Sequence, residues 1–91
     1  MSQQLFYYSA PWCKPCEMLN PVIKQAVEHL GDKIKLLEIN IDEGSDIASK
    51  CEIMSVPTLI LTYKNKEIRR SGYMGVKDII DWIEEFTNSV T

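Results

Sequence analysis

Three cysteines are the residues of this 91-residue chain with the most evident capacity for chemistry. Cys13 and Cys16 enclose only Lys14 and Pro15, whereas Cys51 stands alone. We expect no secretory signal, because the first residues lack the basic start and the apolar stretch that one needs. An odd number of cysteines in such a chain argues against a framework of structural disulfides and for thiols that react or bind a metal.

A redox pair is the first of these alternatives. The cysteines lie where a predicted strand gives way to a predicted helix, so Cys13 should occupy the helix N-terminus. Unpaired backbone N–H groups and the helix dipole there stabilise a thiolate and lower its pKa below about 8.5. Cys16, one turn further in, is expected to be less exposed and less acidic. Cys13 would then attack a substrate disulfide, and Cys16 would displace the substrate thiol from the mixed disulfide.

The two residues between the cysteines are expected to tune this exchange. Pro15 fits the first turn of a helix, where its missing N–H is harmless, and its rigidity should favour the reduced, helical form. Pro15 therefore predicts a reductant. Lys14 adds a positive charge that should lower the pKa of Cys13 modestly.

Zinc binding and inert packing are the alternatives for the same cysteines. Only Cys51 and His29 could complete a zinc site, and structural zinc usually takes four ligands, often as two close pairs. His29 borders the apolar stripe of its predicted helix, where a histidine is more often a surface residue. Inert packing is disfavoured because a thiol pair beside Trp12 is hard to keep unreactive. We therefore predict no metal and no cofactor apart from the redox-active Cys13–Cys16 disulfide.

The surrounding pattern predicts the elements that position the cysteines. Apolar and β-branched runs predict strands at Leu5–Ser9, Ile34–Ile41, Thr58–Tyr63 and Glu67–Tyr73, the last two joined by a tight turn at Lys64-Asn65-Lys66. Helical periodicity predicts a helix over Leu19–Leu30 that ends at Gly31, a short helix capped by Ser45 with Ile47, Ala48 and Cys51 inside, and a helix from Val76 to about Asn88. The order β-α-β-α-β-β-α predicts an α/β fold in one domain over residues 1–91, with a four-stranded mixed sheet sandwiched by helices.

Two prolines have local consequences. Pro21 lies inside the first predicted helix and should kink it, because proline lacks the backbone donor. Pro57 opens the third predicted strand. Since only about 5 to 6% of X–Pro bonds are cis, residue type alone favours a trans bond between Val56 and Pro57.

Composition argues against several classes of function. The net charge is −3 and no basic cluster is present, which argues against nucleic acid as a partner. The longest apolar runs have three or four residues, far fewer than the roughly 20 that a membrane helix needs. With 45% apolar and 25% charged residues, we expect a soluble globule. Because we expect neither a membrane helix nor a secretory signal, we predict a cytoplasmic location.

The segment Trp12-Cys13-Lys14-Pro15-Cys16, together with Val56-Pro57-Thr58, resembles the thioredoxin family. The resemblance extends from about Leu5 to Phe86. It implies a thioredoxin-like fold in which Cys13 attacks and Cys16 resolves.

The same resemblance extends to the surroundings of the cysteines. It implies that Pro57 is cis and stacks beside the disulfide. A shallow apolar patch for a substrate peptide would consist of Trp12, the backbone around Val56, Pro57, and Gly75. Pro21 matches the helix-kinking proline of the family.

One departure from the family pattern is the absence of the strand and helix that normally precede the active-site strand. Ile34–Ile41 is apolar on both faces, as in a strand that is covered on both sides. Without the first strand, it should nevertheless become an edge of the sheet, where Lys33 and Lys35 discourage unwanted pairing.

A second departure concerns the family's buried aspartate and its partner lysine, which fall on Tyr7 and Glu38. We hypothesise that Glu38 takes the proton of Cys16, through a hydroxyl group or a water. The alternative is that Glu38 is an ordinary surface carboxylate.

Cys51 matches an extra cysteine that serves regulation in some animal thioredoxins. At an inner helical position, however, a cysteine is more often small core filler, and we favour that interpretation.

The resemblance implies a monomeric protein disulfide reductase whose partners are protein disulfides and a thioredoxin reductase or a similar electron donor. A glutathione-dependent glutaredoxin is the alternative, since glutaredoxins have the same short β-α-β-α-β-β-α order of elements. Ser55-Val56-Pro57 is also similar to their Thr-Val-Pro segment. Trp12 and Pro15 argue against a glutaredoxin. A redox-inert module that binds a partner through Trp12, Pro57 and Gly75 is a third hypothesis, disfavoured because both cysteines are intact.

Overall fold

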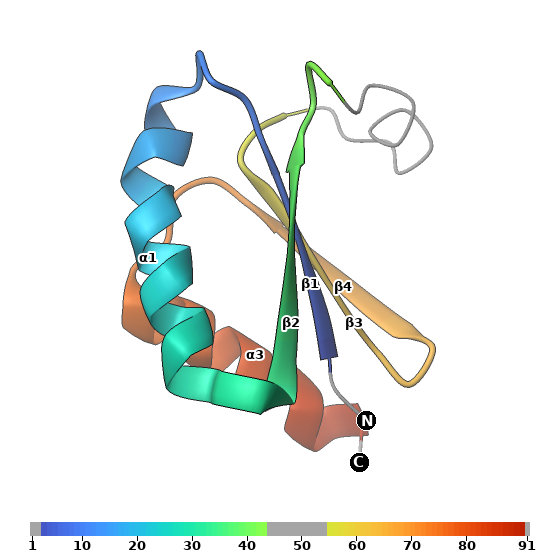
Figure 1. Ribbon diagram of the computed structural model, residues 1–91. Helices are drawn as coiled ribbons and strands as arrows, with labels where there is room; N and C mark the ends of the chain where they lie inside the picture. Colours follow the sequence, from blue (N-terminus) through green and yellow to red (C-terminus); the bar gives the residue numbers. More distant parts are fainter. Residues whose placement is uncertain (1–2, 44–54, 91) are drawn as a thin grey trace.

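The structure is a computed structural model that describes residues 3–43 and 55–90. Its elements follow the order β1 (Gln3–Ser9), α1 (Lys14–Leu30), the 3₁₀ turn η1 (Gly31–Lys33), β2 (Ile34–Asn40), β3 (Thr58–Tyr63), β4 (Lys66–Ser71) and α3 (Val76–Val90) (Figure 1). The short helix predicted after Ser45, and Cys51 with it, lies outside the described residues.

The four strands form one mixed sheet in the order β2-β1-β3-β4. β1 pairs with β2 in parallel, and the crossover helix α1 connects these two strands along the chain. β3 is antiparallel to both β1 and β4. The predicted mixed sheet is therefore confirmed, and β2 is an edge strand as expected. Coverage of β2 is partial on both faces. Ile34 is buried, Leu36, Leu37 and Ile39 are half-buried, and Lys35 and Glu38 are exposed.

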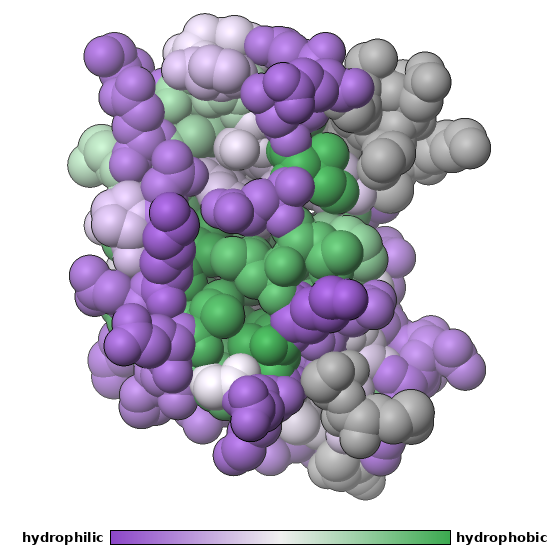
Figure 2. Space-filling model, in the orientation of Figure 1, coloured by the Kyte–Doolittle hydropathy of each residue, from purple (hydrophilic) through white to green (hydrophobic). Residues whose placement is uncertain are grey.

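The main core lies between the sheet and the helices α1 and α3, which pack against each other (Figure 1). Alternation along the strands directs Leu5 and Tyr7 of β1 and Leu59 and Leu61 of β3 toward these helices. The helical contribution comes from the predicted apolar stripes, namely Leu19, Val22, Ile23, Ala26, Ile79, Ile83 and Phe86. In the same orientation, Figure 2 shows hydrophilic side chains along the outer side of α1, as an amphipathic helix requires.

Most differences from the predicted elements lie at their ends. The β3–β4 turn contains only Lys64 and Asn65, with φ of 51° and 65°, and Tyr63 pairs directly with Lys66. Positive φ at both central residues is typical of the two-residue type I′ turn, whose twist matches that of the strands. β4 is consequently shifted toward the N-terminus and ends before Gly72, which has a φ of 88°.

Smaller differences affect the other elements. β1 begins at Gln3 rather than Leu5, and α3 continues to Val90. Pro21 lies inside α1 as predicted, and the kink at Pro21 stays a prediction. In the part of the chain that the structure describes, no helix is long and apolar enough to cross a membrane.

Candidate active site

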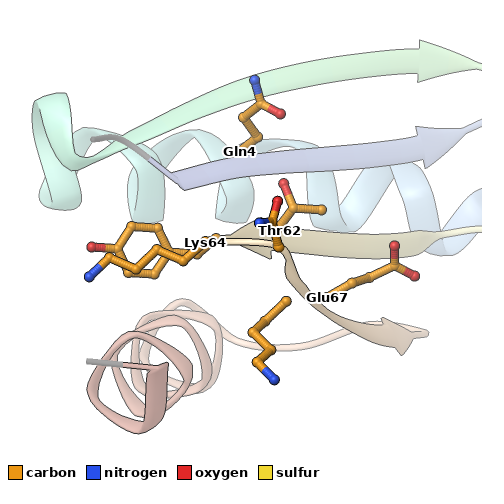
Figure 3. A pocket seen from close by; sticks show the side chains of 7 residues that line it. Gln4, Thr62, Lys64 and Glu67 are labelled. Atoms are coloured by element: carbon orange, nitrogen blue, oxygen red, sulfur yellow. The ribbon is translucent and has the colours of Figure 1, made fainter.

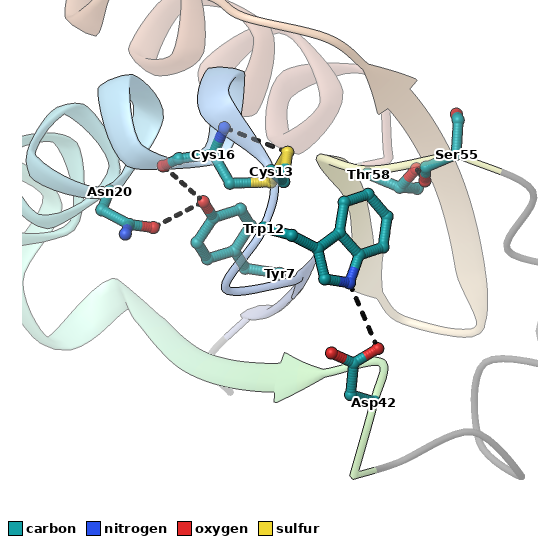
Figure 4. Close-up of a disulfide and its surroundings, with 8 residues drawn as sticks. All are labelled: Tyr7, Trp12, Cys13, Cys16, Asn20, Asp42, Ser55 and Thr58. Atoms are coloured by element: carbon teal, nitrogen blue, oxygen red, sulfur yellow. Dashed lines mark hydrogen bonds between the residues drawn. A yellow bond between two sulfur atoms is a disulfide. The ribbon is translucent and has the colours of Figure 1, made fainter.

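Cys13 and Cys16 form a disulfide at the N-terminus of α1, with their Cα atoms 5.2 Å apart (Figure 4). Cys13 caps the helix in an extended conformation, with φ of −90° and ψ of 110°, and its Sγ accepts the backbone N–H of Cys16 at 3.2 Å. The predicted position of Cys13 at a helix N-terminus is confirmed. Because the first N–H groups of a helix have no partner within the helix, a Cys13 thiolate would gain both this hydrogen bond and the helix dipole.

Both cysteines are buried, with exposed fractions of 4% for Cys13 and 2% for Cys16. In the disulfide form, exposure therefore hardly separates the two sulfurs, contrary to the expectation that Cys16 is clearly the less exposed. Their positions do differ, since Cys13 precedes the helix and Cys16 lies within it. Ala10 joins the two cysteines in a small apolar cluster, against which Ile41 and Val56 pack.

The two residues between the cysteines lie in the first turn of α1. Pro15 occupies the position at which a helix tolerates proline. The Nζ of Lys14 is 3.9 Å from Oε2 of Glu17, and both side chains are exposed. Glu17 therefore offsets part of the positive charge that we expected Lys14 to exert on Cys13, although such an exposed pair is weak.

Trp12 projects from the loop before the cysteines, and its side chain is exposed. Its Nε1 donates to Oδ1 of Asp42 at 3.4 Å (Figure 4). The backbone N–H of Asp42 in turn donates to Oδ1 of Asn40 at 2.9 Å. Sequence reasoning missed Asp42 as a partner of Trp12. The predicted parallel pairing of the first two strands could have indicated this contact, because Trp12 and Asp42 each follow one of them and the ends of parallel strands meet at one edge of the sheet.

The bond between Val56 and Pro57 is cis. This confirms what the thioredoxin resemblance implied, and the trans bond favoured by residue type alone is wrong. Hydrogen bonds fix the loop on both sides, because Thr58 Oγ1 donates to the Ser55 carbonyl at 2.6 Å and Gly72 N–H donates to the Pro57 carbonyl at 3.0 Å. Pro57 is fully buried, and its stacking on the disulfide stays a prediction.

Gly75 is half-buried and precedes α3, where its carbonyl accepts the N–H of Ile79 at 3.1 Å. A Cβ built at this position would meet only Oδ2 of Asp78, at an ordinary contact distance of 3.7 Å. The backbone of Gly75 also lies outside the left-handed region, in contrast to Gly72. The fold therefore does not require glycine at position 75.

Tyr7 lies directly beneath the disulfide, at the position of the family's buried aspartate. Its side chain is 1% exposed, and its hydroxyl lies within donor distance of two acceptors, the Cys16 carbonyl at 3.2 Å and Asn20 Oδ1 at 2.6 Å (Figure 4). Burial, reinforced by the charge of Glu38, raises the pKa of Tyr7 to about 12. The hydroxyl thus stays protonated at neutral pH and serves as a donor. Asn20 was missed, although it lies one turn beyond Cys16 on the same helical face.

Glu38 lies beside Tyr7 in the β1–β2 register, and its side chain is exposed. Tyr7 therefore occupies the space beneath Cys16, while Glu38 lies at the outer edge of the sheet. This arrangement favours the surface-carboxylate alternative, and a role of Glu38 in proton transfer stays a prediction.

Within residues 3–43 and 55–90, no group of three or more His, Cys, Asp or Glu side chains could hold a metal ion. His29 lies in the last turn of α1, about 24 Å along the helix axis from Cys13, too far to share a metal ion. A pocket of about 400 Å³ lies at the hairpin end of the sheet, opposite the cysteines, and is lined by Gln4, Thr62, Lys64 and Glu67 among others (Figure 3).

A disulfide between the cysteine that caps a helix and a cysteine in its first turn, in an α/β fold with a cis-proline loop beside it, defines a thiol–disulfide oxidoreductase. The thioredoxin family model matches residues 2–85. Thioredoxin from Rickettsia bellii is 42% identical over 76 residues, which cover 81% of this chain and 71% of the relative. Thioredoxin from Bacillus subtilis is 39% identical over 62 residues, covering 68% and 60%.

Solved structures agree with these sequence relatives. Thioredoxin-2, a component of the protein secretion machinery of the malaria parasite, superimposes with a TM-score of 0.88 at 26% identity, and the match covers 92% of this chain and 82% of that one. The chain belongs to the thioredoxin family. The matches do not favour the glutaredoxin alternative.

Proposed function

We propose that the chain is a protein disulfide reductase in which Cys13 is the attacking thiol and Cys16 the resolving thiol. The observation that supports these roles is the capping position of Cys13, whose Sγ accepts the Cys16 N–H at 3.2 Å. A sulfur at a helix N-terminus is stabilised as a thiolate, and the thiolate is the form that attacks a disulfide.

The reaction proceeds in two exchanges of sulfur partners. The Cys13 thiolate attacks one sulfur of a substrate disulfide, so a mixed disulfide forms and the other substrate sulfur leaves as a thiolate. The Cys16 thiolate then attacks Cys13 Sγ, which releases the second substrate sulfur and closes the Cys13–Cys16 disulfide. Two electrons pass from the protein dithiol to the substrate, and the leaving thiolates take up protons.

The partners that we propose are protein disulfides and a thioredoxin reductase or similar donor that returns two electrons to the Cys13–Cys16 disulfide. The exposed indole of Trp12 and the loop around Val56 and Pro57 would receive an extended substrate segment. The protein would act as a cytoplasmic monomer of one domain, with no cofactor beyond its own disulfide.

Turnover of a protein disulfide tests this function. With dithiothreitol as electron donor, the chain should accelerate reduction of the insulin interchain disulfides well above the rate of dithiothreitol alone. A rate equal to that of dithiothreitol would contradict the proposal. Efficient recycling by glutathione, with none by a thioredoxin reductase, would favour a glutaredoxin-like activity instead.

Substituting Gly75 with alanine tests the proposed substrate patch. We expect a several-fold higher KM for a protein disulfide, because a Cβ would hold a bound segment away from the surface. The free energy of unfolding should change by less than about 1 kcal/mol, since the new Cβ meets only Asp78. Gly72→Ala is the contrasting variant, because its φ of 88° should make alanine destabilising. An unchanged KM for Gly75→Ala would remove Gly75 from the patch.

Replacing Glu38 with glutamine tests its role in proton transfer. We expect the rate of mixed-disulfide resolution and its pH profile to stay within about twofold of the wild type, since Glu38 is exposed and Tyr7 intervenes. The pKa of Tyr7 should fall, because one cause of its elevation is removed. Stopped-flow kinetics and ultraviolet titration of tyrosine would measure both effects. If the resolution rate of the wild type changed with pH in a step that Glu38→Gln lacked, this would instead support proton transfer to Glu38.

A further inference from the structure

The β4 edge of the sheet carries a concentrated positive charge. Four cations, Lys64, Lys66, Arg69 and Arg70, lie within residues 64–71 against one carboxylate, Glu67, whereas the whole chain has a net charge of −3. All five side chains are exposed, and β4 is the last strand in the sheet order.

The backbone of β4 has a defined set of groups that point away from the sheet. The two residues that flank a two-residue hairpin turn form a hydrogen-bonded pair, here Tyr63 and Lys66. Along an antiparallel ladder, such pairs alternate with pairs that are not hydrogen-bonded. The bond from Gly72 N–H to the Pro57 carbonyl fits this alternation. The backbone groups of Lys66, Ile68, Arg70 and Gly72 therefore point toward β3, and those of Glu67, Arg69 and Ser71 point outward.

The side chains on the helix-facing side of β4 combine charge with an apolar pocket. Ile68 pairs with the core residue Leu61, so Lys66 and Arg70, two positions away on either side, share the face toward α3. A shallow pocket of about 300 Å³ between β4 and α3 is lined by Ile68, Trp82, Glu85, Phe86 and Ser89. Among the described residues, Arg69 pairs with Glu67 at 3.5 Å, while Lys66 and Arg70 have no ion-pair partner.

We propose that the β4 edge is a docking site for an extended acidic segment of a partner protein, which adds to the sheet as a fifth strand. The outward N–H and C=O groups of Glu67, Arg69 and Ser71 bond the backbone of the segment. An apolar residue opposite Ile68 enters the pocket, and acidic residues two positions before and after it face Lys66 and Arg70.

This geometry sets a pattern for the segment, acidic-x-apolar-x-acidic. The carboxylate of Glu85 at the pocket repels an acidic residue from the central position. Cations on an edge strand also discourage indiscriminate pairing, and here the same cations select acidic segments over neutral or basic ones. The proposal concerns binding alone and does not depend on the redox role of the cysteines.

Fluorescence anisotropy with a labelled peptide tests the proposal on the full, oxidised chain. The probe contains Glu-Thr-Val-Thr-Glu, and the comparison peptide contains Lys-Thr-Val-Thr-Lys. We expect saturable binding of the acidic peptide only, weakened by added salt. The double variant Lys66→Glu/Arg70→Glu should weaken binding by more than about tenfold, since it removes two charge-assisted contacts.

A matched control variant distinguishes binding at the β4 edge from general attraction between the acidic peptide and positive charge on the protein. The variant Lys24→Glu/Lys33→Glu makes the same change in net charge at exposed positions outside β4, and it should alter binding by less than about twofold. Equal weakening by both double variants, or equal binding of the two peptides, would overturn the proposal.

Amide shift mapping on the wild-type chain tests the site without any substitution. Titration with the acidic peptide should shift and protect the backbone amides of Glu67, Arg69 and Ser71 more than those of Lys66 and Arg70. A peptide N-methylated at alternate residues should lose this protection. Shifts scattered over the surface, or confined to other elements, would contradict strand addition at β4.

Discussion

Replacing Cys13 with serine should reduce disulfide reduction by this chain to the uncatalysed background, a loss of roughly 10³-fold or more. A serine hydroxyl at the helix N-terminus is not ionised at neutral pH and cannot form the mixed disulfide. Cys16 would not substitute for Cys13, because it lies inside the helix, beyond the capping position that stabilises a thiolate.

Replacing Cys16 with serine should stop the reaction at the mixed disulfide between Cys13 and the substrate. Single-turnover measurements are expected to show an initial release of one substrate thiol through Cys13, followed by no further turnover, because the resolving sulfur is absent. Cys51→Ser is the matched control, since Cys51 has no part in the proposed exchange, and it should retain the wild-type rate. A Cys13→Ser variant that still released substrate thiol, or a Cys51→Ser variant that did not, would contradict the assigned roles.

Replacing Tyr7 with phenylalanine should lower the free energy of unfolding by about 1 to 2 kcal/mol at neutral pH. The substitution keeps the buried ring but removes the hydroxyl whose two acceptors are the Cys16 carbonyl and Asn20 Oδ1. The Cys16 carbonyl would then lose its hydrogen bond from the Tyr7 side chain of β1. We therefore also expect a measurable shift in the reduction potential of the cysteine pair.

The stability difference between the wild type and Tyr7→Phe should depend on pH. The pKa of Tyr7 is raised from 10.0 to about 12 by folding, so between these values the folded chain keeps a proton that the unfolded chain loses. The stabilisation from Tyr7 is thus complete below pH 10 and is lost as pH rises toward 12. The stability advantage of the wild type over Tyr7→Phe should narrow by about 1 kcal/mol at pH 11.

Urea unfolding at pH 8, 10 and 11 measures this difference directly. The two proteins differ only at residue 7, so subtracting the stability of the variant from that of the wild type isolates the contribution of the Tyr7 hydroxyl. A constant stability difference over this range would mean that the Tyr7 hydroxyl is not buried as described.

Local periodicity predicted the helices α1 and α3, because an apolar stripe such as Leu19, Ile23 and Ala26 becomes buried when the segment is helical. The position of Cys13 at a helix N-terminus followed from the same pattern. Strand ends and the hairpin turn were less accurate, since Lys64 and Asn65 adopt positive φ without the glycine that usually signals a type I′ turn.

The rest of the site depends on contacts between segments that are distant in the sequence. Trp12 meets Asp42, 30 residues away, and no local pattern encodes that pairing. The cis bond before Pro57 runs against the general preference for trans and was available only through the family resemblance. Tyr7 was identified as a departure from the family, but its contact with Asn20 required the packing of β1 against α1.

The most direct test of the central claim is to locate the substrate on the Cys16→Ser variant. The variant is incubated with a protein disulfide, the trapped complex is digested without reduction, and the cross-linked peptides are sequenced by mass spectrometry. We predict a single mixed disulfide between Cys13 and a substrate cysteine. Attachment through Cys51, or no covalent complex while the wild type turns over, would contradict the account.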